Sequence, residues 1–181
     1  MKIIAFSGSL RKTSFNTMLL HNVKILAPAE MEIDIVSIGD FPLYSSDDES
    51  SFPPVVQAVK DKIEAADGIF IATPEYNRSL PGVLKNAIDW ISRPYGKNSF
   101  ARKSVLVAGV SSGKIGTAVA QSHLREILVY LDADVIGQPE LYLGPAQSVF
   151  DEDGTITDET IKTILAKGLE ALRARIHTHN A

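Results

Sequence analysis

A short polar loop near the start of the chain has the residue types of a phosphate site. It follows an apolar run over 2–6 and reads Gly8-Ser9-Leu10-Arg11-Lys12-Thr13-Ser14-Phe15-Asn16. Gly8 permits a sharp turn, and the helix expected after the loop points unpaired N–H groups back into it. Arg11 adds a fork of donors that suits phosphate oxygens. The loop therefore predicts a phosphate cradle; the alternative is a polar connection in which Ser14 only caps the helix.

The glycine spacing limits which phosphate ligand this loop suits. The loop lacks both the glycine pattern of dinucleotide folds and that of P-loops, so a single phosphate is favoured over a pyrophosphate. A later loop over 111–116 also invites a P-loop interpretation, because Gly113-Lys114 follows Gly109. Only three residues separate those glycines, and Ile115 stands where a P-loop needs Ser or Thr, which excludes the interpretation. Its small residues instead suit a close backbone approach to the edge of a ring.

The loop over 73–82 has the stiffness that binding a planar ligand requires. Pro74 and Pro81 restrict its two ends, and a fixed backbone keeps donors and acceptors in place for a ring. Tyr76 can pack against a ring while its hydroxyl reaches water. An ordinary helix-entry loop is the alternative interpretation of this segment.

Composition excludes several kinds of chemistry. The chain has no cysteine, which rules out disulfides, thiolate nucleophiles and cysteine-held metal clusters, so redox chemistry would require an organic cofactor. Its four histidines form no metal-binding pattern, the acidic run 47–49 suits a solvated surface, and we expect no metal. The net charge of −4 gives no general attraction to nucleic acid or anionic membranes. No apolar run approaches the roughly 20 residues of a membrane span, and the start lacks a signal-peptide pattern, so a cytoplasmic location is expected.

Apolar runs alternate with helix-period segments along the chain. The expected strands cover 2–6, 31–38, 68–72, 104–110 and part of 134–143, and the expected helices cover 15–26, 52–66, 81–91, 117–131 and 157–176. This alternation predicts an α/β fold, namely a flavodoxin-like, doubly wound, five-stranded parallel sheet with helices on both faces. We expect it to form a single domain over 1–181. Ligands of such sheets bind at the carboxyl ends of the strands, where all three loops would lie.

Three motifs in the chain resemble those of a known family. The stretches are GSLRKTSFN, TPEYNRSLPGVLKNAIDW with SRPYG, and QSHLREIL. In this order and spacing they resemble the NADPH-dependent FMN reductase family, which includes bacterial quinone-, chromate- and azo-dye-reducing flavoproteins. The resemblance covers almost the whole chain.

The resemblance implies a flavodoxin-like FMN protein that uses NADPH or NADH as co-substrate. It implies that the FMN phosphate is held by Ser9, Arg11, Ser14, Phe15 and Asn16. It implies that the isoalloxazine is lined, largely through backbone groups, by Pro74, Glu75, Tyr76 and Asn77, with Ser111 and Gly113 approaching from the third loop. Because FMN would carry the chemistry, no catalytic side chain is expected.

Two positions depart from the family pattern. Arg78 stands where some relatives carry an aromatic residue, and it is a candidate substrate contact that could meet the 2′-phosphate of NADPH. Ser112 stands where many relatives carry proline.

The implied activity is hydride transfer from NAD(P)H through FMN to small acceptors, with quinones favoured over free flavin, azo dyes and chromate. The main alternative is a flavodoxin-like electron carrier without NAD(P)H turnover, and a second is a non-enzymatic binding protein that keeps the fold. Carriers of the first kind have strongly acidic surfaces and Thr/Ser-rich phosphate loops. The basic pair Arg11-Lys12 and the modest net charge favour the enzyme.

The helix over 81–91 carries more apolar surface than one face of a sheet needs. Trp90 and Ile91 are adjacent, so they point about 100° apart on a helix. With Tyr95 beyond them, they predict a contact in a homodimer or homotetramer, as the resemblance also implies. The alternative is that a local loop of the same chain covers Trp90.

Overall fold

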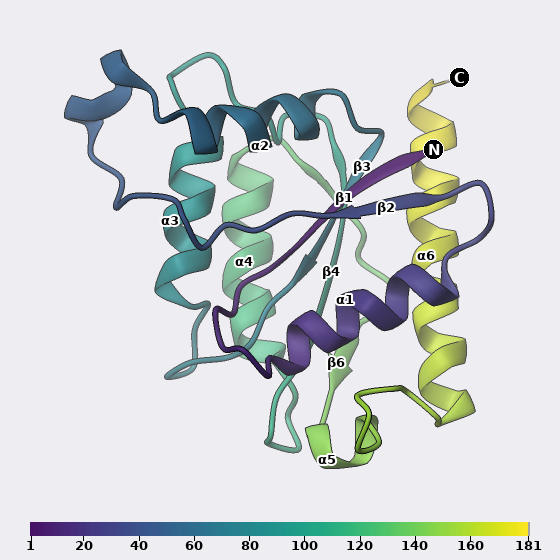
Figure 1. Ribbon diagram of the computed structural model, residues 1–181. Helices are drawn as coiled ribbons and strands as arrows, with labels where there is room; N and C mark the ends of the chain where they lie inside the picture. The colour runs from purple at the N-terminus through teal and green to yellow at the C-terminus, as the bar shows by residue number, and fades with distance from the viewer. Residues whose placement is uncertain (181) are drawn as a thin grey trace.

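A parallel β-sheet runs through the computed structural model, which describes residues 1–180 (Figure 1). Its strands are β1 (Lys2–Ser7), β2 (Glu32–Ile35), β3 (Gly68–Ala72), β4 (Ser104–Val110), β5 (Asp134–Val135) and β6 (Leu141–Leu143). The strand order is β2-β1-β3-β4-β5, and β6 also pairs with β4. This 2-1-3-4-5 order is the flavodoxin-like arrangement, so the predicted fold class is confirmed.

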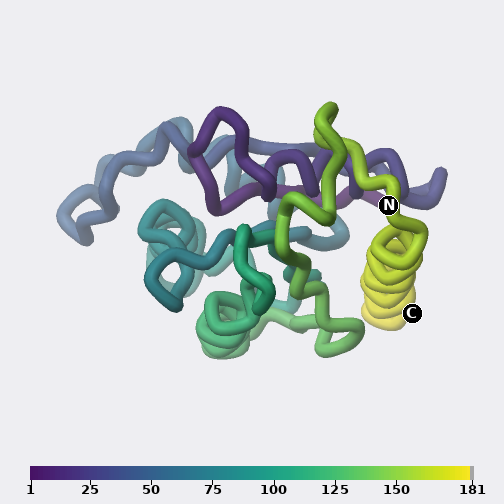
Figure 2. The backbone as a smooth tube through the Cα atoms, turned by 90° about the horizontal axis from the view of Figure 1, so that it is seen from below, coloured from purple at the N-terminus to yellow at the C-terminus, as the bar shows by residue number. Residues whose placement is uncertain are grey.

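Helices cover both faces of the sheet. They are α1 (Phe15–Leu26), α2 (Pro54–Glu64), α3 (Gly82–Ile91), α4 (Ala118–Tyr130), α5 (Ala146–Val149) and α6 (Glu159–Asn180), with a 3₁₀ helix η1 over Ser46–Ser51. Figures 1 and 2 show α3 and α4 together on one side and α6 on the other. Within residues 1–180, none of the helices combines the length and apolar character that crossing a bilayer requires.

The core consists of two apolar layers separated by the sheet. Along β1, Ile3 and Ala5 belong to the layer beneath α1 and α6, whereas Ile4 and Phe6 belong to the layer beneath α2, α3 and α4. Side chains alternate between faces along a strand, and here both faces are covered. This is why β1, β3 and β4 are almost continuously apolar in sequence.

The fifth predicted strand is divided. β5 pairs with the start of β4 and β6 with its end, and residues 136–140 separate the two pieces. Pro139 lies in this gap and has no N–H to donate to a ladder. The sequence therefore located the strand in the right segment but did not predict its interruption.

Trp90 contributes to the core and not to the surface. Its Nε1 donates a hydrogen bond to the Pro42 carbonyl at 2.8 Å, and the rings of Tyr44 and Phe52 pack against it edge-on, with centroids 5.1 and 5.2 Å away. Trp90 is fully buried. The prediction that Trp90 adds to an exposed patch was therefore wrong, and the alternative, a covering loop of the same chain, is correct.

The acidic run 47–49 lies in η1, next to this covering loop. Glu49 accepts a hydrogen bond from the Tyr44 hydroxyl at 2.6 Å. In residues 1–180 no group of three or more His, Asp or Glu side chains is arranged to hold a metal ion.

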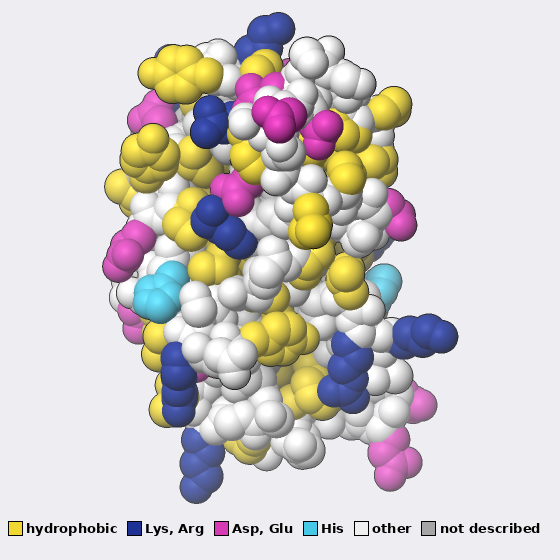
Figure 3. All heavy atoms as spheres, turned by 90° about the vertical axis from the view of Figure 1, so that its left-hand side faces the viewer, with side chains coloured by type: hydrophobic (Ala, Val, Ile, Leu, Met, Phe, Trp, Pro, Cys, Tyr) yellow, Lys and Arg dark blue, Asp and Glu magenta, His cyan; other side chains and the backbone are white. Residues whose placement is uncertain are grey.

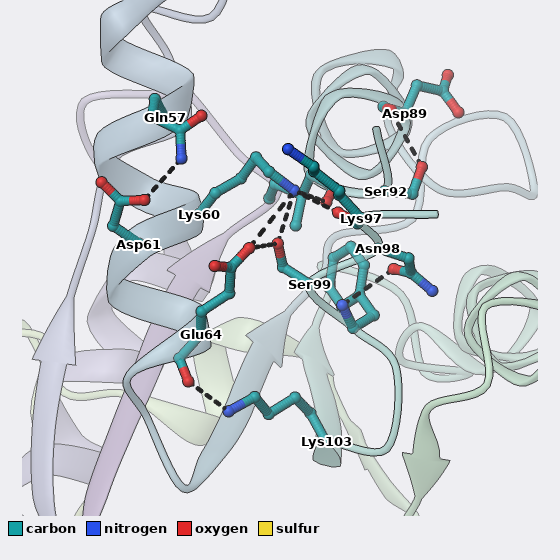
Figure 4. Close-up of polar contacts among 12 residues, drawn as sticks. Gln57, Lys60, Asp61, Glu64, Asp89, Ser92, Lys97, Asn98, Ser99 and Lys103 are labelled. Atoms are coloured by element: carbon teal, nitrogen blue, oxygen red, sulfur yellow. Dashed lines mark hydrogen bonds and ion pairs between the residues drawn. The ribbon is translucent and has the colours of Figure 1, made fainter. Parts of the chain in front are cut away.

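A buried lysine fixes the segment that follows α3 (Figure 4). The ammonium of Lys60 in α2 donates to the Ile91 carbonyl at 2.7 Å, the Lys97 carbonyl at 2.8 Å and the Ser99 hydroxyl at 2.6 Å. These three acceptors take up all three N–H donors of the ammonium group. Burial disfavours the charged form and lowers the pKa of Lys60. Asn98 ties the same segment to α4 through the Leu131 carbonyl at 2.6 Å. These bonds fix residues 97–99 between the ends of α3 and α4.

Candidate functional site

The three loops predicted to bind a ligand meet at the carboxyl edge of the sheet. They enclose a cavity of about 150 Å³, whose lining is Ser9, Arg11, Ser14, Phe15, Asn16, Pro74, Glu75, Tyr76, Val110, Ser111 and Ser112. All predicted cofactor residues except Asn77 and Gly113 are in this lining. Val110 and Ser112 were not among the predicted contacts, although both lie where β4 runs into the third predicted loop. Larger hollows of about 740 and 640 Å³ lie away from these loops.

The first loop is organised by serine hydroxyls. Ser14 is the N-cap of α1, and its Oγ accepts hydrogen bonds from the N–H groups of Asn16 and Thr17, both at 3.2 Å. The Ser9 Oγ lies 3.3 Å from the Tyr76 hydroxyl and accepts from the Arg11 N–H at 3.4 Å. Ser14 therefore does cap the helix, and the same residue lines the cavity. Capping and ligand contact are both compatible with its position.

Aromatic rings support the guanidinium of Arg11. The guanidinium carbon lies 5.2 Å from the centroid of the Phe15 ring, and Phe15 stacks on Phe150 with centroids 6.1 Å apart. The Arg11 Nε donates to the Thr13 hydroxyl at 3.0 Å. Among residues 1–180, the structure records no hydrogen bond from the two terminal nitrogens of Arg11. Both are available for phosphate oxygens. No local sequence pattern indicated a role for Phe150, which follows α5.

The side chain of Asn16 is occupied by the protein itself. Its Nδ2 donates to the Val110 carbonyl, and its Oδ1 accepts from the Val110 N–H, both at 3.0 Å. This pair of bonds ties α1 to the end of β4 and so sets the spacing of the first and third loops. Asn16 was predicted as a phosphate contact, but its amide has this structural task, which no local pattern could indicate because the partners are far apart in sequence.

The second loop contains a tight two-residue hairpin. Tyr76 and Ser79 exchange backbone hydrogen bonds of 3.0 Å in both directions. Between them, Asn77 and Arg78 have φ of 51° and 61°, the left-handed values of a type I′ turn. Asn accepts this backbone conformation readily, whereas Arg rarely adopts it. The turn places Asn77 and Arg78 outside the cavity lining, and the Arg78 side chain is 67% exposed.

Glu75 connects this hairpin to α4. Its Oε2 accepts from the N–H groups of Val119 at 3.0 Å and Ala120 at 3.1 Å, and its Oε1 accepts from Arg78 at 3.1 Å. Glu75 was predicted to contact the ring through its backbone, and no task was predicted for its carboxylate.

The end of β4, just before the third loop, lies so close to the second loop that only glycine fits at position 109. A Cβ at Gly109 would lie 2.2 Å from the Thr73 carbonyl oxygen and 2.1 Å from the Thr117 hydroxyl. Ser111 lines the cavity, and its N–H donates to the Leu143 carbonyl at 3.2 Å. Gly113 is exposed, and its N–H donates to the Ser111 hydroxyl at 3.2 Å. Gly113 lies outside the cavity lining, and the approach of this loop to the edge of a ring stays a prediction.

This donor set fits a phosphorylated ligand with a planar ring. The cavity lining offers hydroxyls, a guanidinium and the start of α1, which together suit a phosphate dianion. It also offers the stiff backbone after Pro74 and the half-exposed ring of Tyr76, which suit a planar ring. FMN contains both kinds of group.

Comparisons with known proteins agree with this geometry. The model of the NADPH-dependent FMN reductase family matches residues 1–148. The chain is 49% identical over 165 residues to a 2-hydroxy-1,4-benzoquinone reductase of a Burkholderia species, covering 91% of this chain and 90% of that protein. It is 46% identical over 163 residues to a quinone reductase of Escherichia coli, covering 88% and 86%.

A solved structure is similar over almost the full length. The flavoenzyme FerB, an NAD(P)H:(acceptor) oxidoreductase of Paracoccus denitrificans, superposes with a TM-score of 0.91 at 39% identity, covering 98% of each chain. The family match and these identities lead to one assignment. The chain belongs to the NADPH-dependent FMN reductase family.

Proposed function

We propose that this protein is an FMN-dependent NAD(P)H oxidoreductase that reduces quinones, with free flavin, azo dyes and chromate as further acceptors. The observation that carries the proposal is the meeting of three separate loops around one cavity, whose lining combines phosphate-binding side chains with the stiff backbone after Pro74. The quinone-reducing relatives support the choice of acceptor. We further propose that the chain acts as one FMN-binding domain, in the cytoplasm, where NAD(P)H is available.

Each loop has its own task in the proposed site. Ser9, Arg11, Ser14 and Phe15 hold the phosphate, with Asn16 fixing the loop from behind. The backbone of 74–77 lines the ring, and Ser111 approaches it from the third loop. Bound FMN supplies the two-electron hydride chemistry. The protein contributes position and electrostatics, and no side chain of the cavity lining has to act as acid or base.

The proposed enzyme uses one open site for both substrates in turn. NAD(P)H and the quinone both have flat rings, and the partly exposed Tyr76 borders the place where either would lie. Initial rates measured against NADPH at several quinone concentrations should therefore give parallel lines in a double-reciprocal plot. Converging lines would show that both substrates are bound together and would contradict a shared site.

A flavodoxin-like electron carrier is the other function that this fold supports. The basic residues Arg11 and Lys12 beside the phosphate site and the family match both favour the reductase. A carrier would show no sustained NAD(P)H oxidation in the same assay.

We also propose that the protein forms a homodimer through a groove between α3 and α4. The groove has a volume of about 640 Å³, and Tyr95 and Tyr130 at its edge are 92% and 87% exposed. Its lining includes the cations Lys85 and Arg93 and the anions Asp89 and Glu126. Figure 3 views the side of the molecule that carries α3 and shows hydrophobic groups interspersed with charges of both signs.

This mixture favours a second copy of the same chain as the occupant. In a two-fold symmetric contact the same patch meets itself, so its cations can face its own anions. The bonds to Lys97 and Asn98 anchor the segment that carries Tyr95 beside the groove.

A further inference from the structure

The carboxylate of Glu75 is held in a closed set of contacts. Its side chain is only 7% exposed, and a buried charge is costly unless partners compensate it. The partners here are two backbone N–H groups of α4 and the guanidinium of Arg78. The negative charge also lies at the positive end of the α4 dipole.

The start of α4 depends on this carboxylate. Thr117 is the N-cap residue, but its side chain makes no capping bond, and its Oγ1 instead accepts from Gln121 at 2.9 Å. The first turn of α4 contains no acidic residue. Glu75 therefore supplies the cap from the second loop, between β3 and α3, 44 positions earlier than Val119.

A second contact fastens the other end of the hairpin. The Ser79 hydroxyl lies 3.0 Å from Nδ1 of His123, one helical turn beyond the residues that Glu75 caps. The hairpin Tyr76–Ser79 is thus attached to α4 on both sides of its turn. Between the attachments, Arg78 keeps an unfavourable left-handed backbone conformation while its side chain pairs with Glu75.

We propose that Glu75 is a positioning residue, whose carboxylate holds the ring-binding hairpin against α4 and so fixes the backbone of 74–77 for the flavin ring. The inference rests on the proposed function for the role of that backbone. The proposed task of the carboxylate depends on the length of the side chain. Only a side chain as long as that of Glu places an oxygen within hydrogen-bond distance of the N–H groups of Val119 and Ala120.

Two conservative variants separate reach from charge. Glu75→Gln keeps the length and one acceptor oxygen but removes the charge, whereas Glu75→Asp keeps the charge and is one methylene shorter. Glu75→Asp should weaken binding of FMN and of riboflavin equally, by about tenfold, which corresponds to about one lost hydrogen bond to a charged group. Glu75→Gln should lose clearly less affinity for both flavins than Glu75→Asp does. Glu152→Gln, which removes a charge from an exposed loop residue, is the matched control.

The measurements are flavin titrations by fluorescence quenching and amide hydrogen exchange at Val119 and Ala120. We expect faster exchange at both amides in Glu75→Asp, near-normal exchange in Glu75→Gln and no change in Glu152→Gln. Equal flavin affinities in wild type and Glu75→Asp, or a larger loss in Glu75→Gln than in Glu75→Asp, would overturn the proposal. A wild-type protein that binds no flavin would refute the proposed function instead, while the exchange data would still report on the contact with α4.

Discussion

Replacement of Arg11 by alanine is expected to raise the dissociation constant for FMN by about 10- to 100-fold, the value of a charge-assisted hydrogen bond. Binding of riboflavin, which lacks the phosphate, should be nearly unchanged. The reason is the placement of the guanidinium over Phe15, with its terminal nitrogens directed to no other described group. Two parallel N–H donors match the geometry of phosphate oxygens.

Titration of the flavin-free protein with FMN and riboflavin measures this difference directly. Lys12→Ala is the matched control, because Lys12 is an exposed neighbouring cation outside the cavity lining. It should change the FMN affinity far less than Arg11→Ala does. Equal losses for FMN and riboflavin in Arg11→Ala would show that Arg11 does not contact the phosphate. This pattern also differs from that expected for Glu75→Asp, in which the affinities for FMN and riboflavin should fall equally.

Replacement of Tyr130 by glutamate should convert the proposed dimer into a monomer. The change removes an exposed ring from the groove and places an unpaired carboxylate in the contact. Burying such a charge without a partner weakens association by at least about 100-fold, or about 3 kcal/mol. Trp90 is unsuitable for this test, because it is buried within one chain and its replacement would damage the core.

Light scattering across a range of protein concentrations gives the readout for the dimer. Ile25→Glu is the matched control, since Ile25 is 80% exposed on α1 and lies outside the groove. We expect wild type and Ile25→Glu to be dimers and Tyr130→Glu to be a monomer. A wild-type protein that stays monomeric at high micromolar concentration would contradict the proposed interface.

Elements with strong local signals could be predicted from the sequence. The helix over 15–26 was predicted with its observed bounds, because Ser14 caps its start and Pro28 stops its continuation. The strands over 68–72 and 104–110 were also predicted at their observed bounds, since buried parallel strands are continuous apolar runs. Their alternation with helices was sufficient for the fold class.

Features that depend on distant partners could not be predicted. The covering of Trp90 could not be predicted, because Pro42, Tyr44 and Phe52, which surround the indole, lie about 40 to 50 positions earlier in the chain. The capping of α4 by Glu75 has no local pattern, because the acceptor and its donors belong to different elements. The three loops that line the cavity were located from the sequence. Which side chains face the cavity, and which instead bond neighbouring elements to hold the loops in place, could not be predicted.

The most direct test of the central claim is an anaerobic spectrum of the purified protein with its bound cofactor. We predict one FMN per chain, identified by mass spectrometry after release. NADPH or NADH should bleach the visible flavin absorbance in the absence of any acceptor, and added quinone should restore it. A released cofactor identified as FAD, the lack of any bound flavin after reconstitution, or a flavin absorbance that neither nucleotide bleaches would contradict the account.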